Sequence, residues 1–258
     1  MNKNIIITGY PKSGTTWVSG LVAELIQCPL VGDWGFDNSN CPYVEGLERN
    51  SSFRCFKSHQ AFNELKDTAS LPIHKIIYIV RDPRDIVISG IYYFSFSIPF
   101  VARFLKNIGL KEFEMFLSRI INKLLTKREK KRQLIKSVLK GDKNVNYWFK
   151  FAWKEHCLSF KNQNILCLKY EDILAAPEVE CEKIMKYLKL SITKEHIEES
   201  IKKQSFELKK ENALNQKNVL LKKLIRKGRA GSWKKELSKK EKDIFHEKLN
   251  SFCSFYKF

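Results

Sequence analysis

Short apolar runs alternate with helical periodicity over much of the chain. The runs predict buried parallel strands at Ile5–Thr8, Phe53–Lys57, Lys75–Val80 and Asn164–Lys169. Helical patterns lie between and after them, which is typical of an α/β domain whose central parallel sheet is flanked by helices. In such sheets ligands bind at the carboxyl ends of the strands. The residues that follow each strand are therefore the first place to look for chemistry.

The segments outside this alternation differ in character. Residues 28–52 are rich in glycine and proline and predict a long loop. Residues 95–150 predict a helical insertion or lid, in which Lys111–Leu125 has the apolar spacing of an amphipathic helix. This stripe runs into the basic residues 127–132 and could lie on an anionic membrane, although the core-facing side of a lid helix is the commoner use of such a pattern.

Composition narrows the class of protein. A chain of 258 residues with 43% hydrophobic residues fits one globular domain, here taken as 1–258, and excludes a disordered protein. We find no signal sequence and no apolar run long enough to span a bilayer. The seven cysteines are scattered, without a CxxC pair, which argues against a disulfide framework and a zinc site. This usage predicts a reducing compartment and hence the cytoplasm.

The formal charge of +19 is concentrated in two stretches. Residues 119–143 hold ten Lys and Arg against two acids, and residues 202–240 hold fourteen against three. Solvated helical faces of a lysine-rich protein would account for both stretches. The alternative is a pair of positive walls that face an anionic ligand or surface.

The first strand leads into a loop typical of anion binding. Gly9 and Gly14 bracket a tight turn, and the hydroxyls of Thr15 and its neighbours meet the start of an apolar-periodic helix. The backbone N–H groups of such a loop and the helix dipole favour a phosphate. The loop departs from a Walker A motif, because Lys12 precedes the second glycine and no Lys-Thr pair follows it. This predicts a phosphate held without the usual magnesium ligands.

Two further segments carry cations suited to phosphate. Arg81 lies at the tip of the third predicted strand, and Ser89 lies about two turns along the helix that follows. Arginine suits forked binding of phosphate, although Arg81 could instead pair with Asp85. The segment Arg226–Gly231 combines cations with glycines that allow close approach to an oxyanion. Together with the first loop, these segments imply a ligand with phosphate at two separated places.

Five motifs, in order along the chain, resemble those of the cytosolic-type sulfotransferases. Tyr10–Trp17 resembles their 5′-phosphosulfate loop, and Arg81 with Ser89 resembles their 3′-phosphate motif. Arg226–Lys234 is similar to their C-terminal RKGxxGDWK element. The remaining two are Lys57-Ser58-His59, which matches their Lys-Thr-His, and Tyr170-Glu171-Asp172, which matches their Tyr-Glu-Asp.

The resemblance implies a P-loop NTPase-like three-layer fold and a known donor. That donor is 3′-phosphoadenosine 5′-phosphosulfate, which leaves as 3′-phosphoadenosine 5′-phosphate, and no metal ion is required. The basic segment 202–240 would close over the donor. The donor-binding residues implied by the motifs are Lys12, Ser13, Gly14, Thr15, Thr16, Trp17, Arg81, Ser89, Tyr170, Phe206, Arg226, Lys227 and Gly228.

Three residues carry the implied reaction. His59 would be the general base that takes a proton from the acceptor, and imidazole suits this because its ordinary pKa lies near neutrality. Lys12 would stabilise the bridging oxygen of the leaving group, where negative charge grows. Lys57 would stabilise the sulfuryl group in transfer. Of the five histidines, only His59 is accompanied by a matching motif.

The chain departs from the family's pattern at three places. Ser232 stands where the family has Asp before Trp233, and Gln204 stands where it has Thr before Ser-Phe. Lysine at position 239 replaces the apolar valine of the animal dimer motif, which predicts a monomer. The Gln204 replacement puts one predicted contact to the donor in doubt.

Two rival functions and an open acceptor remain at this stage. A small-molecule kinase would need magnesium and ATP, and the missing Gly-Lys-Thr argues against it. A basic scaffold for nucleic acid or anionic lipid would use the two charged stretches. We expect a small-molecule, lipid or glycan acceptor, no nucleic acid, and possible peripheral contact with an anionic membrane. An apolar acceptor is favoured by Phe94, Phe96, Phe100 and Phe104.

Overall fold

The protein divides into two compact units, each of which is described by itself. The computed structural model describes residues 3–39, 41–68, 71–94, 96, 120, 123–143, 147–215 and 228–255. The first unit combines Met1–Asp82 with His156–Gly231, and the second combines Pro83–Glu155 with Ser232–Phe258.

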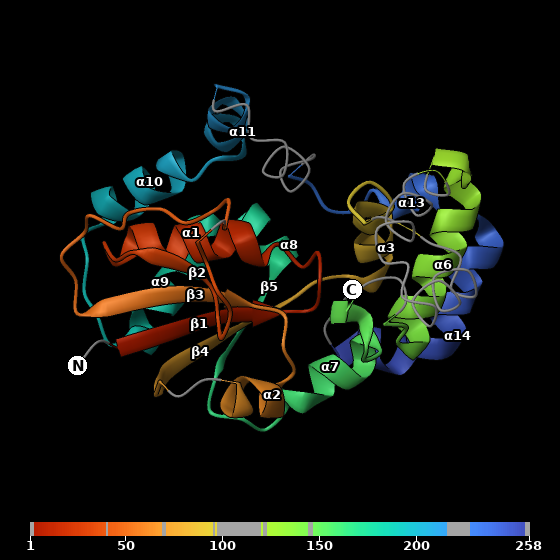
Figure 1. Cartoon of the computed structure of the whole chain (residues 1–258), viewed down its shortest axis with the longest axis horizontal. Coiled ribbons are helices and arrows are strands. Elements are labelled where there is room, and N and C mark those ends of the chain that lie inside the picture. Colours follow the sequence, from red (N-terminus) through yellow and green to blue (C-terminus); the bar gives the residue numbers. More distant parts are fainter. Residues whose placement is uncertain are drawn as a thin grey trace. The chain divides into compact units, whose positions relative to one another are not determined.

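The first unit contains a five-stranded sheet in the order β2-β3-β1-β4-β5, with every pair parallel (Figure 1). The predicted central parallel sheet is therefore confirmed: three of the four apolar runs fall within a strand, and the fourth, Asn164–Lys169, contains β5. A parallel sheet buries both faces, which explains why these strands are continuously apolar. The strands are β1 (Lys3–Gly9), β2 (Leu30–Asp33), β3 (Phe53–Ser58), β4 (Ile73–Val80) and β5 (Leu166–Lys169).

The prediction of a long loop over residues 28–52 is wrong in part, because β2 lies within it. The strand has only four residues, and its pairing with β3 shifts register between Leu30 and Gly32. Gly32 has a φ of 127°, a conformation that favours glycine. A short strand interrupted by a glycine carries no readable alternation, so the apolar pattern did not reveal it.

Helices cover both faces of the sheet. Ile5 and Ile7 of β1 point into an apolar core that includes residues of α1, α8, α9 and α10. On the opposite face, aromatic rings form the packing. Tyr78 of β4 stacks on Phe160 with centroids 4.3 Å apart, and Phe62 of α2 meets the same ring edge-on at 5.7 Å. The helices of this unit are α1 (Thr15–Leu25), α2 (Phe62–Asp67), α8 (Tyr170–Ala175), α9 (Pro177–Leu188), α10 (Lys194–Lys203) and α11 (Phe206–Asn215).

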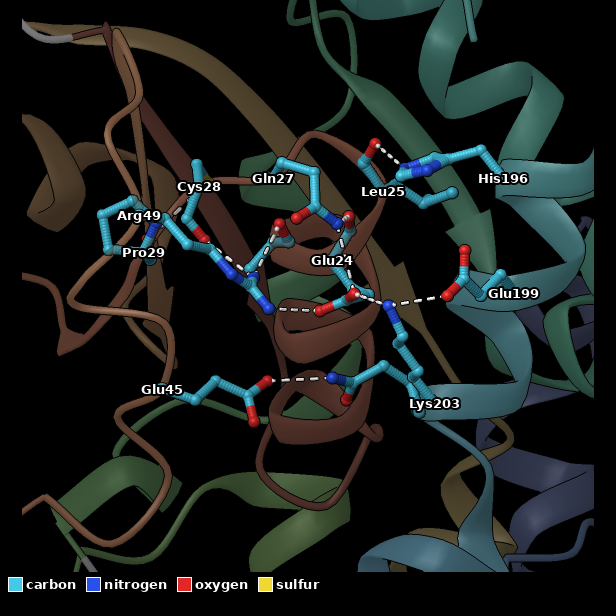
Figure 2. A network of polar contacts seen from close by, with 12 residues as sticks. Glu24, Leu25, Gln27, Cys28, Pro29, Glu45, Arg49, His196, Glu199 and Lys203 are labelled. Carbon is cyan, nitrogen blue, oxygen red and sulfur yellow. Dashed lines mark hydrogen bonds and ion pairs between the residues drawn. The ribbon is translucent and has the colours of Figure 1, made fainter. Parts of the chain in front are cut away.

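A polar network fastens α1 to its surroundings (Figure 2). The carboxylate of Glu24, almost fully buried, pairs with Arg49 and, at 3.3 Å, with Lys203 of α10. Burial alone would raise the pKa of Glu24, but a hydrogen bond from Gln27 and the charge of Arg49 outweigh it and lower the pKa. His196 contacts the carbonyl of Leu25 at 3.0 Å. Through Lys203, the last residue of α10, the network holds the C-terminal end of this helix against α1.

The second unit is built from helices. In this unit α3 packs against α6 and α13. A Cβ added at Gly90 of α3 would lie 3.0 Å from a methyl group of Leu134 of α6, so α3 and α6 approach closely. Phe94 and Phe96 are buried here, and Phe94 meets Phe149 with centroids 4.8 Å apart. Its elements are α3 (Pro83–Ile91), α6 (Lys127–Lys140), η1 (Tyr147–Phe149), α13 (Trp233–Glu236) and α14 (Lys239–Phe255), and α7 (Trp153–Ser159) spans the boundary between the units.

Much of the predicted helical insertion falls outside the described residues. The amphipathic helix predicted at Lys111–Leu125 lies there, apart from Ile120 and residues 123–125. Within the ranges that the structure describes, no helix combines the length and the apolar character needed to cross a membrane.

Candidate active site

The loop between β1 and α1 forms a tight turn at the carboxyl end of the sheet. The N–H of Ser13 donates to the carbonyl of Tyr10 at 3.0 Å. Lys12 and Gly14 both have left-handed backbones, with φ of 70° and 89°, and Gly14 is the N-cap of α1. The first N–H groups of a helix have no partner within the helix, so they are available to an anion at this end. The predicted glycine turn before the helix is thus present, and anion binding by it stays a prediction.

Gly14 is required for space as well as for conformation. A Cβ at this position would lie 2.5 Å from the ring of Tyr170, the first residue of α8. We expect Gly14→Ala to lower the free energy of unfolding by about 2–5 kcal/mol, from left-handed strain and overpacking together. Gly231→Ala is a matched control, because Gly231 has a φ of 78° and nothing within 4 Å of an added Cβ. Urea denaturation of both variants tests this; an equal loss in the two would contradict the Tyr170 contact.

Arg81, just after β4, connects three parts of the site. Its Nη1 donates to the carbonyl of Lys12 at 2.9 Å, and its Nη2 donates to the carbonyl of Arg229 at 3.2 Å. The guanidinium also lies 4.2 Å from the centroid of the Tyr170 ring, a cation–π distance. Residues of four predicted motifs therefore meet at the tip of β4. These motifs are spread over the sequence from Lys12 to Arg229.

The aromatic residues predicted at the site also come together. Trp17 meets Tyr170 edge-on, with centroids 5.9 Å apart, and its Nε1–H donates to the carbonyl of Gln204 at 2.8 Å. A Cβ at Gly228 would lie 2.6 Å from the ring of Phe206. The side chain of Gln204 has another partner, because its Nε2–H donates to Oε1 of Glu45 at 3.1 Å. The backbone of Gln204 is therefore what contacts the predicted adenine-stacking residue.

Among the buried polar atoms without a hydrogen-bond partner in the described residues are two that can donate and that belong to the loop and the strand tip. They are Oγ of Ser13, in the loop, and Nε of Arg81, at the strand tip. A buried donor left unpaired is costly, and native proteins rarely tolerate one without a reason. Both side chains can donate to a phosphate oxygen. The residues present therefore fit a ligand with phosphate groups.

His59 follows β3 and is fixed by the backbone of the first strand. Its Nδ1 lies 2.7 Å from the carbonyl of Gly9. Because a carbonyl can only accept, Nδ1 carries the proton and Nε2 has the lone pair in the neutral ring. Burial and the charge of Lys57 lower the pKa of His59 to about 3. The ring is neutral at physiological pH, as a general base must be.

A second histidine, which the sequence did not single out, supports the first. Nε2 of His156 lies 3.1 Å from the carbonyl of His59, and its Nδ1 lies 3.0 Å from the hydroxyl of Tyr78. His156 is 1% exposed, and burial lowers its pKa to about 4. Both contacts link residues far apart in sequence, and no local motif surrounds His156. Only the folded structure identifies it as a support of the His59 backbone.

The low pKa of His156 predicts acid lability. The unfolded histidine titrates near pH 6.5 and the folded one near 4, so the unfolded state binds more protons between these values and stability falls as pH drops below 6.5. From pH 7 to pH 5, His156 should account for a loss of about 2 kcal/mol in unfolding free energy. Urea denaturation of wild type and His156→Gln at both pH values tests this; equal losses would refute it.

Lys57, predicted to act on the sulfuryl group, is held by two residues that the sequence did not reveal. Its Nζ lies 2.7 Å from Oδ1 of Asp33 and 2.7 Å from the hydroxyl of Tyr43. Both partners come from the segment predicted as a loop, Asp33 as the last residue of β2. Carboxylate and phenol side chains are common in loops, so no pattern distinguished these two.

Not every predicted residue belongs to the described part of the first unit. Ser89 lies on α3 in the second unit, and Arg226 and Lys227 lie outside the described residues. Thr15 and Thr16 begin α1 beside Gly14, as predicted. No group of three or more His, Cys, Asp or Glu side chains suited to a metal ion occurs among the described residues. The roles assigned to these residues, and the expectation of a metal-free reaction, stay predictions.

Comparison with known proteins identifies the family. A family model described as "Sulfotransferase domain" matches residues 2–252. The chain belongs to the sulfotransferase family. The family predicted from the five motifs is thereby confirmed, and so is the assignment to the transferases that move sulfuryl groups. Mouse Sulfotransferase 2A6 is 28% identical over 97% of the chain and 86% of its own length. Rat Sulfotransferase 2A1 is 26% identical over the same shares.

Solved sulfotransferase structures share the fold. Mouse sulfotransferase SULT7A1, solved in complex with PAP, aligns with a TM-score of 0.65 at 24% identity and covers 96% of this chain and 85% of that one. Retinol dehydratase, solved with androsterone and "inactive cofactor PAP", aligns with a TM-score of 0.61 at 19% identity and covers 97% and 80%. The predicted P-loop NTPase-like fold is confirmed by these likenesses together with the parallel sheet.

Proposed function

We propose that this sulfotransferase moves a sulfuryl group from 3′-phosphoadenosine 5′-phosphosulfate to a hydroxyl or amine of its acceptor. One observation carries the proposal. Arg81 bonds the carbonyls of Lys12 and Arg229 while its Nε and the hydroxyl of Ser13 stay buried and unpartnered. This arrangement leaves one unsatisfied donor in the loop before α1 and one at the tip of β4, and a ligand with two phosphate groups would satisfy both.

The donor would be held mainly by backbone and side chains of the first unit. The loop N–H groups and the hydroxyls of Ser13, Thr15 and Thr16 would bind the 5′-phosphosulfate. Trp17, supported by Tyr170 and close to the segment that begins with Phe206, would stack on the adenine. For the 3′-phosphate, the residues proposed from the motifs are Arg81, Ser89, Arg226, Lys227 and Gly228.

The reaction would be an in-line displacement. Nε2 of His59 would take the proton of the acceptor hydroxyl or amine as that atom forms its bond to sulfur. The bond between sulfur and the bridging oxygen breaks, and 3′-phosphoadenosine 5′-phosphate leaves. Lys12 would stabilise the negative charge on that oxygen. The bound anionic donor would raise the pKa of His59 from about 3, which would make it a stronger base when it is needed.

Names of relatives suggest the acceptor class. A guinea-pig relative, 25% identical over 97% of this chain, is a 3-beta-hydroxysteroid sulfotransferase. Retinol dehydratase was solved with retinol and with androsterone. We therefore propose a small-molecule acceptor with a hydroxyl group, ahead of a lipid or glycan.

The test is transfer from the proposed donor to a library of hydroxysteroids, phenols, retinoids and amines, read by mass spectrometry as a gain of one sulfuryl group. A thermal-shift series with 3′-phosphoadenosine 5′-phosphate, ATP–magnesium and an oligonucleotide runs beside it. We expect stabilisation by the first ligand. Stabilisation by ATP–magnesium instead would favour the kinase, and binding to the oligonucleotide that weakens steeply with salt would favour the basic scaffold.

The exposed face of α6 supports contact with an anionic membrane. Four exposed cations occur at every fourth position of this helix and form one stripe, the α6 cationic stripe (Arg128, Arg132, Lys136 and Lys140). The opposite face is buried through Leu134 and Val138. Leu124, just before the helix, is 74% exposed. We propose that the stripe binds anionic lipid headgroups, since exposed apolar and basic residues side by side favour a membrane.

Vesicle sedimentation tests this contact. Replacing the α6 cationic stripe by four glutamines should lower binding to phosphatidylserine-containing vesicles at least about tenfold, since each basic residue near such a surface is worth about 1 kcal/mol. The matched control removes four exposed lysines of the first unit: Lys161, Lys186, Lys189 and Lys194. Equal binding of the two variants would contradict a specific role for the stripe.

We further propose that the protein acts as a monomer in the cytoplasm. The lysine at position 239 argues against the animal dimer contact. The described cysteines are free thiols, including Cys28 and Cys55, whose sulfur atoms lie 3.4 Å apart. Free thiols at this distance fit a reducing compartment. Light scattering of the purified protein tests the monomeric state. Microscopy of a tagged copy in its host tests the cytoplasmic location.

A further inference from the structure

The Lys57 ammonium lies in a small, nearly closed polar cluster at the end of β3. Lys57 is 7% exposed, and its Nζ contacts Oδ1 of Asp33 and the hydroxyl of Tyr43, each at 2.7 Å. The Tyr43 hydroxyl in turn donates to Oδ2 of Asp33. Nζ also lies 4.5 Å from the centroid of the Tyr43 ring. Three side chains thus form a closed triangle of charge-assisted hydrogen bonds.

Both partners of Lys57 are fixed by their own backbones. Asn38 bonds Asp33 twice: its Oδ1 accepts from the N–H of Asp33 at 2.6 Å, and its Nδ2 donates to the Asp33 carbonyl at 2.9 Å. The next N–H along the chain, that of Trp34, donates to the Lys57 carbonyl at 2.8 Å. The carboxylate is therefore anchored to the same strand end as the lysine it contacts.

Tyr43 is anchored by a second pairing with β2. Glu45 and Leu30 exchange two backbone hydrogen bonds, at 2.9 and 3.2 Å. This bridge lies two residues after Tyr43 and holds its segment beside the sheet. Locked backbones and mutual hydrogen bonds are what a preorganised site requires.

The charges of the cluster balance. Burial would raise the pKa of Asp33, but the charge and hydrogen bond of Lys57 outweigh it and lower the pKa, so the carboxylate stays ionised. Burial and the Asp33 carboxylate raise the pKa of Tyr43, so the phenol keeps its proton. An ammonium has three donors, and two are used by these partners. One N–H of Lys57 is left for a further acceptor.

We propose that Asp33 and Tyr43 are positioning residues that hold the Lys57 ammonium beside His59 for the sulfuryl group in transfer. The inference rests on the proposed function. A lysine side chain has four rotatable bonds, and ordering it during the reaction would cost conformational entropy. The triangle fixes it before the donor arrives, so that the remaining N–H can stabilise charge that develops on the sulfuryl oxygens.

The same cluster sets the electrostatics of His59. Lys57 lowers the pKa of this histidine, whereas Asp33 raises it. A cation beside the base without its carboxylate would oppose proton transfer to the ring. Asp33 offsets the effect of Lys57 on the pKa of His59, so a lysine and the proposed general base can lie two residues apart at the end of β3.

A double-mutant cycle tests the positioning role. The variants are Asp33→Asn, Asp33→Glu, Tyr43→Phe, Lys57→Met and the double variant Asp33→Asn/Lys57→Met, assayed for kcat and for KM of donor and acceptor. Asp37→Asn is the matched control, because Asp37 lies in the same turn, is exposed, and contacts Ser39 rather than Lys57. Urea denaturation of each variant separates lost catalysis from lost folding.

We expect Asp33→Asn to lower kcat about 10- to 100-fold, with donor KM unchanged, since it removes a hydrogen bond between charged groups. Tyr43→Phe should cost about three- to tenfold, Asp33→Glu should recover part of the loss, and Asp37→Asn should match wild type. In the Lys57→Met background Asp33→Asn should have a much smaller effect, because its positioning role acts through the lysine and only its direct charge effect on His59 is left.

Three results would overturn the inference. A wild-type kcat in Asp33→Asn would show that the carboxylate does not serve Lys57, and a full additional loss in the double variant would show that it acts independently. A rise in acceptor KM with kcat unchanged would also overturn it, by making Asp33 an acceptor-binding residue. If wild type transfers no sulfuryl group to any acceptor, the proposed function itself fails, which the parallel wild-type assay reveals separately.

Discussion

The His59→Ala variant should lose sulfuryl transfer by a factor of about 10² to 10⁴ in kcat, the range that a positioned general base contributes. The reason is the placement of the ring. Its Nδ1 bonds the Gly9 carbonyl at 2.7 Å, which presents the basic Nε2 in a fixed tautomer at the strand end. Steady-state kinetics with the donor and one confirmed acceptor measure the loss.

A matched histidine and a binding assay make this result specific. His74→Ala removes an exposed histidine near the opposite end of β4 and should keep wild-type kinetics. His59→Ala should still bind 3′-phosphoadenosine 5′-phosphate with wild-type affinity, because this product carries no group that His59 is proposed to contact. Wild-type turnover in His59→Ala would remove it as the base.

The pH dependence adds a second signature of the same residue. The profile of kcat/KM reports groups of the free enzyme, in which the pKa of His59 lies near 3. A base with so low a pKa stays deprotonated as the pH falls from 8 to 5. The acid limb of kcat/KM should therefore lie below pH 5, and an acid limb near pH 6.5 would show that the free-enzyme base is an unperturbed histidine.

The sheet was predictable where its strands are long, apolar and continuous. Ile5–Thr8 and Lys75–Val80 are buried on both faces, and such strands appear in sequence as uninterrupted apolar runs. The edge strand β2 was missed for the opposite reason. It has four residues and a glycine at its centre, so its identity depends on pairing with β3 and not on its own composition.

The glycine turn and the strand-tip arginine of the candidate site were predictable because each lies in a local pattern. A glycine loop, a cation and a helix start lie within eight residues, and Arg81 follows a clear strand. The supports of the proposed catalytic residues were not predictable, because each contact joins distant segments: Asp33 with Lys57, and His156 with the His59 carbonyl. Tertiary contacts of single polar residues leave no periodicity.

The basic stretch at 119–143 shows how charge can mislead at the sequence level. Part of it is structural: Lys127 pairs with Glu236 at 2.9 Å and Lys131 with Glu241 at 2.8 Å, which fastens α6 to α13 and α14. Four other cations of α6 form the exposed stripe. The stretch therefore holds structural ion pairs as well as exposed cations, which composition could not separate, and the choice between a solvated face and a positive wall concerns only the exposed ones.

Lys12→Ala should lower kcat by about 10² to 10³, the usual cost of removing one group that stabilises charge in the transition state. The side chain is proposed to act on the bridging oxygen, where charge appears only as the bond to sulfur breaks. The loss should therefore fall mainly on kcat, with a smaller effect on affinity for 3′-phosphoadenosine 5′-phosphate. Single-turnover kinetics and titration calorimetry with this product measure the two separately.

The backbone around Lys12 makes the substitution interpretable. Arg81 bonds the carbonyl of Lys12 and not its side chain, so alanine keeps that link. Residue 12 has a φ of 70°, and lysine and alanine both carry a Cβ, so the left-handed strain is nearly the same in both. Lys189→Ala is the matched control, since Lys189 is exposed and has a φ of 57° at the end of α9. A kcat loss of equal size in both variants would assign the effect to the backbone, whereas a loss confined to Lys12→Ala assigns it to the ammonium group.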